Sequence, residues 1–111
     1  MAKVNKPPPF DESLAAAHVG KHILVGITYL DHEGNETRRQ QLHGIIKTAS
    51  RGGILIALKG NSEGKTWNMP PDLRCIQKAS PGRYRLHGTD ETIDDPDLLA
   101  TWTIQAPPPV H

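Results

Sequence analysis

The feature that most constrains the fold is a series of short apolar segments between residues 20 and 79, each separated from the next by turn-forming residues. The segments are 22–30, 41–46, 54–58, 67–73 and 75–77. The residues between them are rich in Gly, Asn, Asp and Ser, which favour tight turns. Several short strands at near-regular spacing are typical of a small β-barrel or β-sandwich. This pattern therefore predicts a mainly β fold, and it argues against most enzyme classes.

Alternation within three of these segments assigns one face of each strand to the core. The residues expected to point inward are Ile23, Val25, Ile27 and Tyr29, then Leu42, Gly44 and Ile46, then Ile54, Ile56 and Leu58. Gly26 and Gly44 lie inside strands, where we expect the bends or bulges that barrel closure requires. Residues 70–73 (Pro-Pro-Asp-Leu) predict a single 3₁₀ turn before the strand at 75–77, because prolines cannot donate to a strand ladder.

A short helix is expected ahead of the strands, at residues 11–19. Asp11 can cap its first turn, and Gly20 suits its left-handed end. Nine residues make a marginal helix alone, so it must dock on the strands, through Leu14, Val19 and Phe10. The alanines in its centre have the highest helix propensity.

The chain of 111 residues is expected to form one domain at 10–105, between disordered proline-rich tails at 1–9 and 106–111. Its last part is predicted to be a C-terminal β extension with a strand at 84–87, a helical turn from Asp95 and a closing strand at 100–104. A single cysteine, Cys75, permits no internal disulfide. There is no apolar run of the roughly 18 residues a membrane helix needs, and no secretory leader pattern. We therefore expect a cytoplasmic protein without a membrane partner.

Charge is distributed unevenly along the chain. All 13 Lys and Arg residues lie between Lys3 and Arg85, whereas residues 88–111 hold only acidic charge. Such asymmetry can mark a partner-binding surface, although acids packed on the basic part of the chain, or simply solvated, fit it as well. Two surfaces are predicted as alternatives for binding a protein partner. One is the acidic segment with Asp90, Glu91, Asp94, Asp95 and Asp97, and the other is a groove near Trp67, Pro70 and Pro71.

No pattern in the chain predicts catalysis, a metal or a cofactor. Residues 60–66 look like a P-loop, but three residues instead of four separate the two glycines, and prolines follow where a helix is needed. His18 and His22 are four apart, but Gly20 ends the helix between them, and the remaining histidines are scattered. Cys75 is expected to be a buried packing residue. The expected protein is therefore not an enzyme.

Nucleic-acid binding is the alternative function. Basic residues interleaved with aromatic ones are the pattern such proteins use. The candidates are Arg38, Arg39, Arg51 and Lys65. Acidic residues in the same turns dilute their charge, and aromatic residues make up only 5% of the chain, which leaves few surfaces on which bases can stack.

The expected order of helix, strands and a proline-containing 3₁₀ turn before the last strand resembles an SH3-like barrel over about residues 20–79. A leading helix followed by five strands also resembles Sm-like RNA-binding proteins. The chain departs from that family because it lacks the Asp-x-x-Met-Asn stretch in its second and third strands. Its Arg74-Cys75 also lacks the glycine of the family's Arg-Gly pair.

The whole chain also looks like a type of stand-alone bacterial protein with a Pro-Pro-Asp-Leu turn, a Pro-Gly-x-Tyr strand and an Asp-Pro-Asp stretch before a Trp. Small single-domain proteins of this kind are often dedicated inhibitors, such as immunity proteins that neutralise a toxin. The leading hypothesis is a non-enzymatic protein-binding module, an immunity-type inhibitor, on an SH3-like barrel. The sequence predicts no oligomeric state.

Overall fold

The computed structural model describes residues 10–86 and 89–108, and it is mainly β with one short helix, as predicted. The elements in chain order are α1 (Glu12–His18), β1 (His22–Leu30), β2 (Glu36–Ser50), β3 (Gly53–Leu58), η1 (Gly60–Ser62), β4 (Thr66–Met69), η2 (Leu73–Cys75), β5 (Ile76–Lys78), β6 (Arg83–Arg85), β7 (Thr92–Asp94) and β8 (Leu98–Gln105). The expected tail at 1–9, and residues 109–111 of the other, lie outside the described residues.

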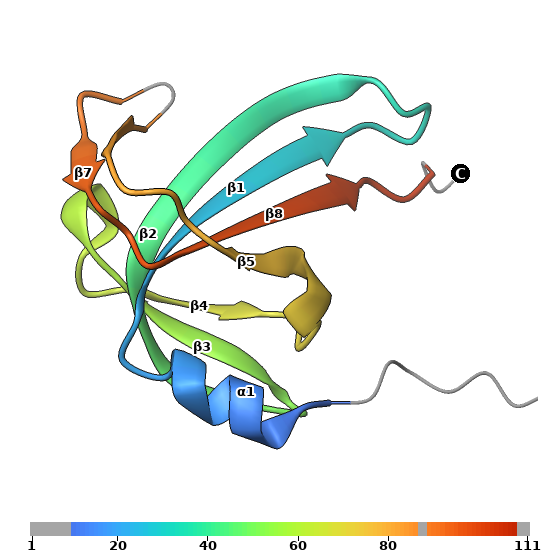
Figure 1. The fold of residues 1–111 in the computed structure, drawn as a ribbon. Coiled ribbons are helices and arrows are strands. Elements are labelled where there is room, and N and C mark those ends of the chain that lie inside the picture. Colours follow the sequence, from blue (N-terminus) through green and yellow to red (C-terminus); the bar gives the residue numbers. More distant parts are fainter. Residues whose placement is uncertain (1–9, 87–88, 109–111) are drawn as a thin grey trace, which may run out of the picture.

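One sheet of six strands carries most of the structure, in the order β4-β3-β2-β1-β8-β5, and β6 and β7 pair separately (Figure 1). The 15-residue β2 pairs with β1 through its first part and with β3 through its last part, and Figure 1 shows it bending between the two. The strands β4 and β5 are the two edges, and within the described ranges no ladder joins them.

The C-terminal strand β8 is part of the main sheet and not an extension beside it. It lies between β1 and β5, parallel to β1 and antiparallel to β5. The expected helical turn from Asp95 does not form, because Asp95 adopts φ 48° and the chain then runs extended into β8. The early strands and the last strand therefore depend on each other, whereas the sequence predicted a C-terminal extension.

The core lies on the inner face of the curved sheet, and it includes the residues that alternation assigned to it together with Leu98 and Ala100 of β8. Ile23, Ile46, Ile54 and Ile56 are fully buried there, and Met69 from β4 joins them. Burying a side chain of this size contributes roughly 1.5–3 kcal/mol. The alternating pattern therefore identified the residues that stabilise the sheet.

The irregularities in the strands are not at the two glycines. Register shifts occur between Tyr29 and Leu30 and between Ile46 and Thr48. Gly44 instead marks a close approach, since a Cβ there would overlap the backbone of Ala57 on the neighbouring strand. A glycine inside a strand can indicate either a bulge or a close approach of another backbone, and the local sequence does not distinguish the two.

The helix α1 forms as predicted, but it docks through a different residue. Asp11 accepts a hydrogen bond from the Leu14 N–H (3.0 Å), and Gly20 has φ 85°. Ala15 is the buried residue of α1, whereas Leu14 and Val19 remain 43% and 45% exposed. The small alanine lets the helix backbone approach the strands, so the larger side chains on either side of it point away from the core.

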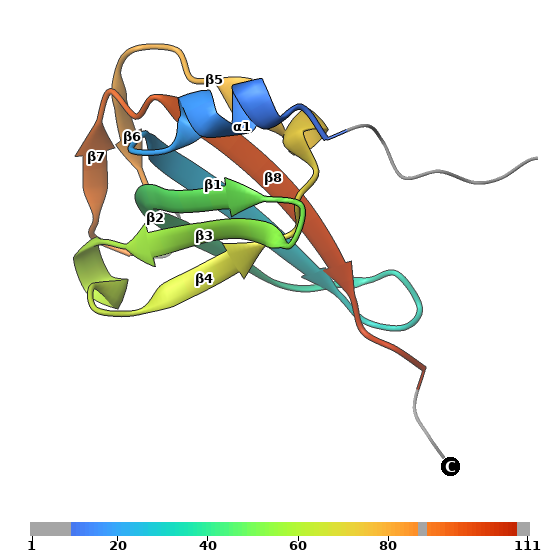
Figure 2. The same ribbon diagram turned by 90° about the horizontal axis from the view of Figure 1, so that it is seen from below.

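A second, smaller hydrophobic cluster lies on the outer face of the sheet. Leu24 of β1 packs there against Leu86 and Ile93 from the β6–β7 hairpin. Figure 2 shows this hairpin standing at one end of the sheet, beside η1. No helix within the described ranges is long and apolar enough to cross a membrane.

Candidate functional site

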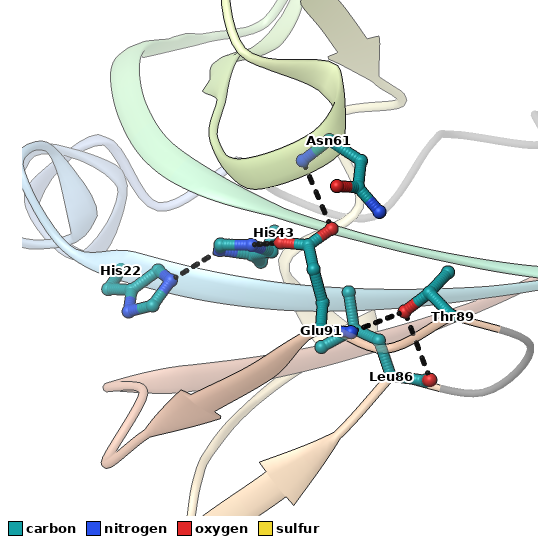
Figure 3. Close-up of polar contacts among 6 residues, drawn as sticks. All are labelled: His22, His43, Asn61, Leu86, Thr89 and Glu91. Carbon is teal, nitrogen blue, oxygen red and sulfur yellow. Dashed lines mark hydrogen bonds and ion pairs between the residues drawn. The ribbon is translucent and has the colours of Figure 1, made fainter.

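A chain of three polar side chains crosses the outer face, where the β6–β7 hairpin meets the sheet (Figure 3). His22 Nε2 lies 3.0 Å from His43 Nδ1, and His43 Nε2 lies 2.7 Å from Glu91 Oε2. His43 is 8% exposed and is the buried polar residue among those described. We call this set, His22, His43 and Glu91, the His–His–Glu chain.

Local structure places each member. His22 begins β1 and pairs with Ile45 on β2, and His43 lies two residues from Ile45 on the same face of the sheet. Both histidines take the outward positions of their strands, opposite to the core residues Ile23 and Leu42. Glu91 precedes β7, 48 residues after His43. The contact therefore depends on the hairpin folding back over the sheet.

The hydrogen-bond geometry assigns the protons. An ionised Glu91 can only accept, so His43 Nε2 carries a proton and donates to it. In neutral His43 the other nitrogen, Nδ1, must then accept, which makes His22 Nε2 the donor. One added proton is tolerated, because a doubly protonated His43 can donate to both neighbours. A second added proton would set two N–H donors face to face and break the contact between the histidines.

The carboxylate also ties the hairpin to η1. The Asn61 N–H donates to Glu91 Oε1 (3.1 Å). Gly60 has φ 68°, and a Cβ at this position would overlap Glu91 and contact the His43 ring. Glycine is therefore required here twice, for its left-handed backbone and for its missing side chain.

Backbone contacts hold Glu91 in this position. Its N–H donates to Thr89 Oγ1 (3.0 Å), and its carbonyl accepts from the Leu86 N–H (2.9 Å). Thr89 Oγ1 in turn donates to the Leu86 carbonyl (3.2 Å). These contacts fix the backbone from which the Glu91 side chain extends toward His43.

Two members have shifted pKa values. Burial is the largest influence on the pKa of Glu91 and would raise it, but the hydrogen bonds from His43 and Asn61 prevail and hold it below its ordinary value. Burial, and then the charge of His43, lower the pKa of His22, and the nearby Asp97 offsets this only in part. Both shifts favour the state in which Glu91 is ionised and His22 is neutral.

The geometry is that of a structural hydrogen-bond network and not of a metal-binding cluster. Its members are joined in a line, and among the residues that the structure describes no three His, Cys, Asp or Glu side chains converge on one point as metal ligands would. The His–His–Glu chain joins β1, β2, η1 and the β6–β7 hairpin at a single position.

A groove lies at the β5 edge of the sheet, between α1 and β5. Its volume is about 440 Å³, and its lining includes Leu14, Lys21, Ile76 and Lys78. We call it the α1–β5 groove. Figure 2 shows α1 lying beside β5. His18 also lines it, and burial together with Lys21 lowers the pKa of His18, so that its ring is neutral at pH 7.

Most of the predicted acidic surface is engaged in internal contacts. Asp94 Oδ1 accepts from Arg83 (2.9 Å), Asp95 Oδ1 from the Gly82 N–H (2.7 Å), and Asp97 Oδ2 from the His22 N–H (2.9 Å). Glu91 belongs to the His–His–Glu chain, and Asp90 is exposed. These carboxylates close the turns that hold the hairpin to the sheet.

The predicted groove residues lie at the other edge of the sheet. Trp67 is half-buried on β4 and packs against the core, and Pro70 and Pro71 are exposed after it. Of the residues predicted to bind a protein partner, Asp97 lines the α1–β5 groove, and the others are not in its lining.

The predicted basic residues do not share one surface. Arg38 stacks over Tyr29 at 4.1 Å, and Arg39 pairs with Glu36 at 3.0 Å. Being adjacent in β2, these two point to opposite faces of the sheet. Arg51 follows the far end of β2, 3.9 Å from Glu12, and exposed Lys65 precedes β4.

Sequence reasoning missed the two histidines as partners. Only one signal pointed to His43, its place between apolar neighbours at an outward strand position, and that signal does not reveal a contact with residue 91. Arg85, which lines a cleft described below, was also missed, because local sequence does not reveal which distant residues it lies beside.

No protein-family model, curated protein or solved structure matches this chain.

Proposed function

We propose that this protein is a non-enzymatic protein-binding module that holds an extended segment of its partner in the α1–β5 groove. The observation that supports this is an open strand edge beside an exposed apolar side chain. Strand β5 is an edge of the sheet, and Leu14 on α1 is 43% exposed next to it. Adding a strand to such an edge is a common way to bind peptides.

The backbone of β5 supplies the hydrogen-bonding groups. The Ala79 N–H donates to the Asp97 carbonyl (3.0 Å), and Gln77 pairs with Leu99. Because backbone groups alternate along an antiparallel strand, those of Gln77 face β8 and those of Lys78 face the open edge. A partner strand would therefore bond to Lys78.

The lining of the groove defines the chemistry of the partner. Lys21 and Lys78 are both exposed at its rim, while its acidic residue, Asp97, already accepts from the His22 N–H. Leu14 and Ile76 offer apolar contact. We infer an extended segment with an apolar side chain flanked by acidic ones, because charge complementarity speeds association and favours the correct partner.

The finer form of this proposal is a cytoplasmic, immunity-type inhibitor on an SH3-like barrel that stays open between β4 and β5. The curved sheet supports it, as does the 3₁₀ turn η2 that directly precedes β5. An inhibitor of this kind needs a rigid scaffold with one exposed docking edge, and β5 supplies that edge.

Affinity purification of the tagged protein from its own host tests the proposal, with paired charge-reversal variants. Lys21→Glu with Lys78→Glu changes the groove, and Lys47→Glu with Lys59→Glu makes the same change in charge at exposed positions outside it. We expect a stoichiometric partner that survives nuclease treatment, is lost from the first variant and is kept by the second. Equal retention by both variants would exclude the groove.

Nucleic-acid binding is the second candidate, because one polar cleft carries two arginines, Arg39 and Arg85. In the same purification it predicts recovery of RNA or DNA that nuclease removes and that falls steeply with added salt. No recovered nucleic acid at low salt would end this candidate.

A further inference from the structure

A cleft on the outer face of the sheet is lined by two arginines and four neutral residues. Its volume is about 380 Å³, and its lining residues are Ile27, Thr28, Arg39, Gln40, Gln41 and Arg85. No carboxylate is among them. The lining therefore holds two positive charges, and the carboxylate that pairs with Arg39, that of Glu36, lies outside it. We call it the arginine cleft.

Two separate elements supply the arginines. Arg39 on β2 is directly opposite Thr28 on β1, so their side chains share the outer face. Arg85 comes from β6, in the hairpin that packs on that face through Leu86 and Ile93. The fold thus brings together a hydroxyl and two guanidinium groups from three strands.

Arg85 differs from the other arginines of the described part of the chain. Arg39, Arg51, Arg74 and Arg83 each have a carboxylate within 4.0 Å, and Arg38 stacks on Tyr29. In the same described residues, neither a carboxylate nor an aromatic ring pairs with Arg85. Its five N–H donors are available to a ligand.

Arg39 can also serve a ligand. Its Nε donates to Glu36 Oε1 at 3.0 Å, which leaves its terminal nitrogens free. The pair is solvent-exposed on both sides, with 59% and 44% of the side chains accessible. Such pairs contribute only about 0–1 kcal/mol, so an anion competes with Glu36 at little cost.

We propose that the arginine cleft binds a phosphate group, clamped between Arg39 and Arg85 with Thr28 as an additional donor. Arginine matches the oxygens of a phosphate with two parallel hydrogen bonds, which lysine cannot do. The phosphate could belong to a small phosphate ester or to a nucleic-acid backbone, and the shared chemistry is the same. The cleft shares no lining residue with the α1–β5 groove, so this site does not rest on the proposed peptide binding.

Backbone NMR titration of the full chain with pyrophosphate tests the site. We expect saturable shifts in the residues around the cleft. Arg85→Gln should weaken binding by about tenfold, the loss of one charge-assisted contact. The matched control is Arg83→Gln, two positions earlier on the same strand, whose guanidinium is already paired with Asp94. It should change affinity by less than about threefold, since Arg83 is not in the lining and Asp94 already offsets its charge.

A short single-stranded oligonucleotide, titrated in parallel, identifies the source of the phosphate. Much tighter binding than pyrophosphate, weakened by Arg85→Gln, indicates a nucleic-acid backbone, and equal or weaker binding indicates a small ester. The proposal is overturned if neither probe gives saturable shifts at the cleft, or if Arg83→Gln and Arg85→Gln weaken binding equally. Both variants change exposed side chains, and their amide spectra report directly whether the fold is retained.

Discussion

The inner and outer faces of the same strands, β1 and β2, are stabilised in different ways. The inner face is a continuous aliphatic core with fully buried isoleucines from three strands. The outer face carries a small apolar cluster, the His–His–Glu chain and the arginine cleft. The inner face needs only apolar side chains at alternate positions, whereas the outer face needs particular polar groups from distant segments at particular distances. The two faces should therefore respond differently to substitution.

The inner face should give the largest loss of stability. Ile56→Ala removes a fully buried side chain from the centre of the core and should lower the free energy of unfolding by about 2–5 kcal/mol. Urea denaturation measures this loss. The matched control is Ile104→Ala on β8, where the side chain is 42% exposed and the expected loss is below about 1 kcal/mol. Similar losses at both positions would contradict the assignment of the core.

The outer face should be most sensitive at Gly60. Gly60→Ala adds a Cβ that overlaps Glu91 and strains a backbone with φ 68°, at an expected cost of about 1–3 kcal/mol. Gly34→Ala is the control, since its φ is 91° but nothing lies within 4 Å of an added Cβ. Thermal unfolding of both variants separates the overlap from the backbone strain. If Gly34→Ala loses as much, Gly60 does not act through Glu91.

The link between the hairpin and the sheet should follow next. Glu91→Gln removes the charge from the hydrogen bond to His43 and should cost about 1–2 kcal/mol. A double-mutant cycle with His43→Gln measures the coupling between the two residues, because each variant alone also changes other contacts. Strictly additive losses would mean that the 2.7 Å contact contributes nothing to stability.

The outer face should also contribute to the pH dependence of stability, through His22 and Glu91. The pKa of His22 is lowered from its ordinary value of 6.5 in the folded protein, so the unfolded chain binds more protons just below that pH. The contribution of His22 is therefore complete above pH 6.5 and is lost as the pH falls toward the folded pKa. The pKa of Glu91 is also lowered, and its contribution is lost in the same direction, below about its ordinary 4.5.

His22→Gln keeps an N–H donor for His43 and cannot titrate, so it should flatten the fall in stability between pH 7 and pH 5. Melting temperatures measured across this range for both proteins test the expectation. The matched variant is His32→Gln, which changes an exposed histidine in the β1–β2 turn, outside the His–His–Glu chain. If the change of melting temperature with pH were the same in His22→Gln as in the wild type, His22 would not contribute to it.

The smallest effect is expected where the sequence predicted docking of the helix. Leu14→Ser changes a side chain that is 43% exposed, so stability should change by less than about 0.5 kcal/mol, mostly through helix propensity. Urea denaturation tests this. A loss of several kcal/mol would instead place Leu14 in the core.

Alternation and turn residues, both local signals, predicted the mainly β fold, the inward positions on β1, β2 and β3, and the capped helix. Each of these rests on neighbours a few residues apart, as with Asp11 and the Leu14 N–H. The position of β8 between β1 and β5 could not be predicted in this way, because one of its pairing partners, β1, is the first strand of the chain. The prediction assigned docking to Leu14 because it judged side chains by hydrophobicity and not by how closely a backbone can approach.

The sequence by itself determined which side chains are apolar, how often they recur and where the chain can turn, and these are sufficient to define the inner face. Only the tertiary structure decided that His22, His43 and Glu91 meet, that four of the five C-terminal acids are used internally, and that Arg85 joins Arg39. The physical reason lies in the range of the interactions. Apolar burial is non-directional and follows a local pattern, whereas a hydrogen bond needs two particular atoms within about 3 Å. Only the folded chain brings such atoms together.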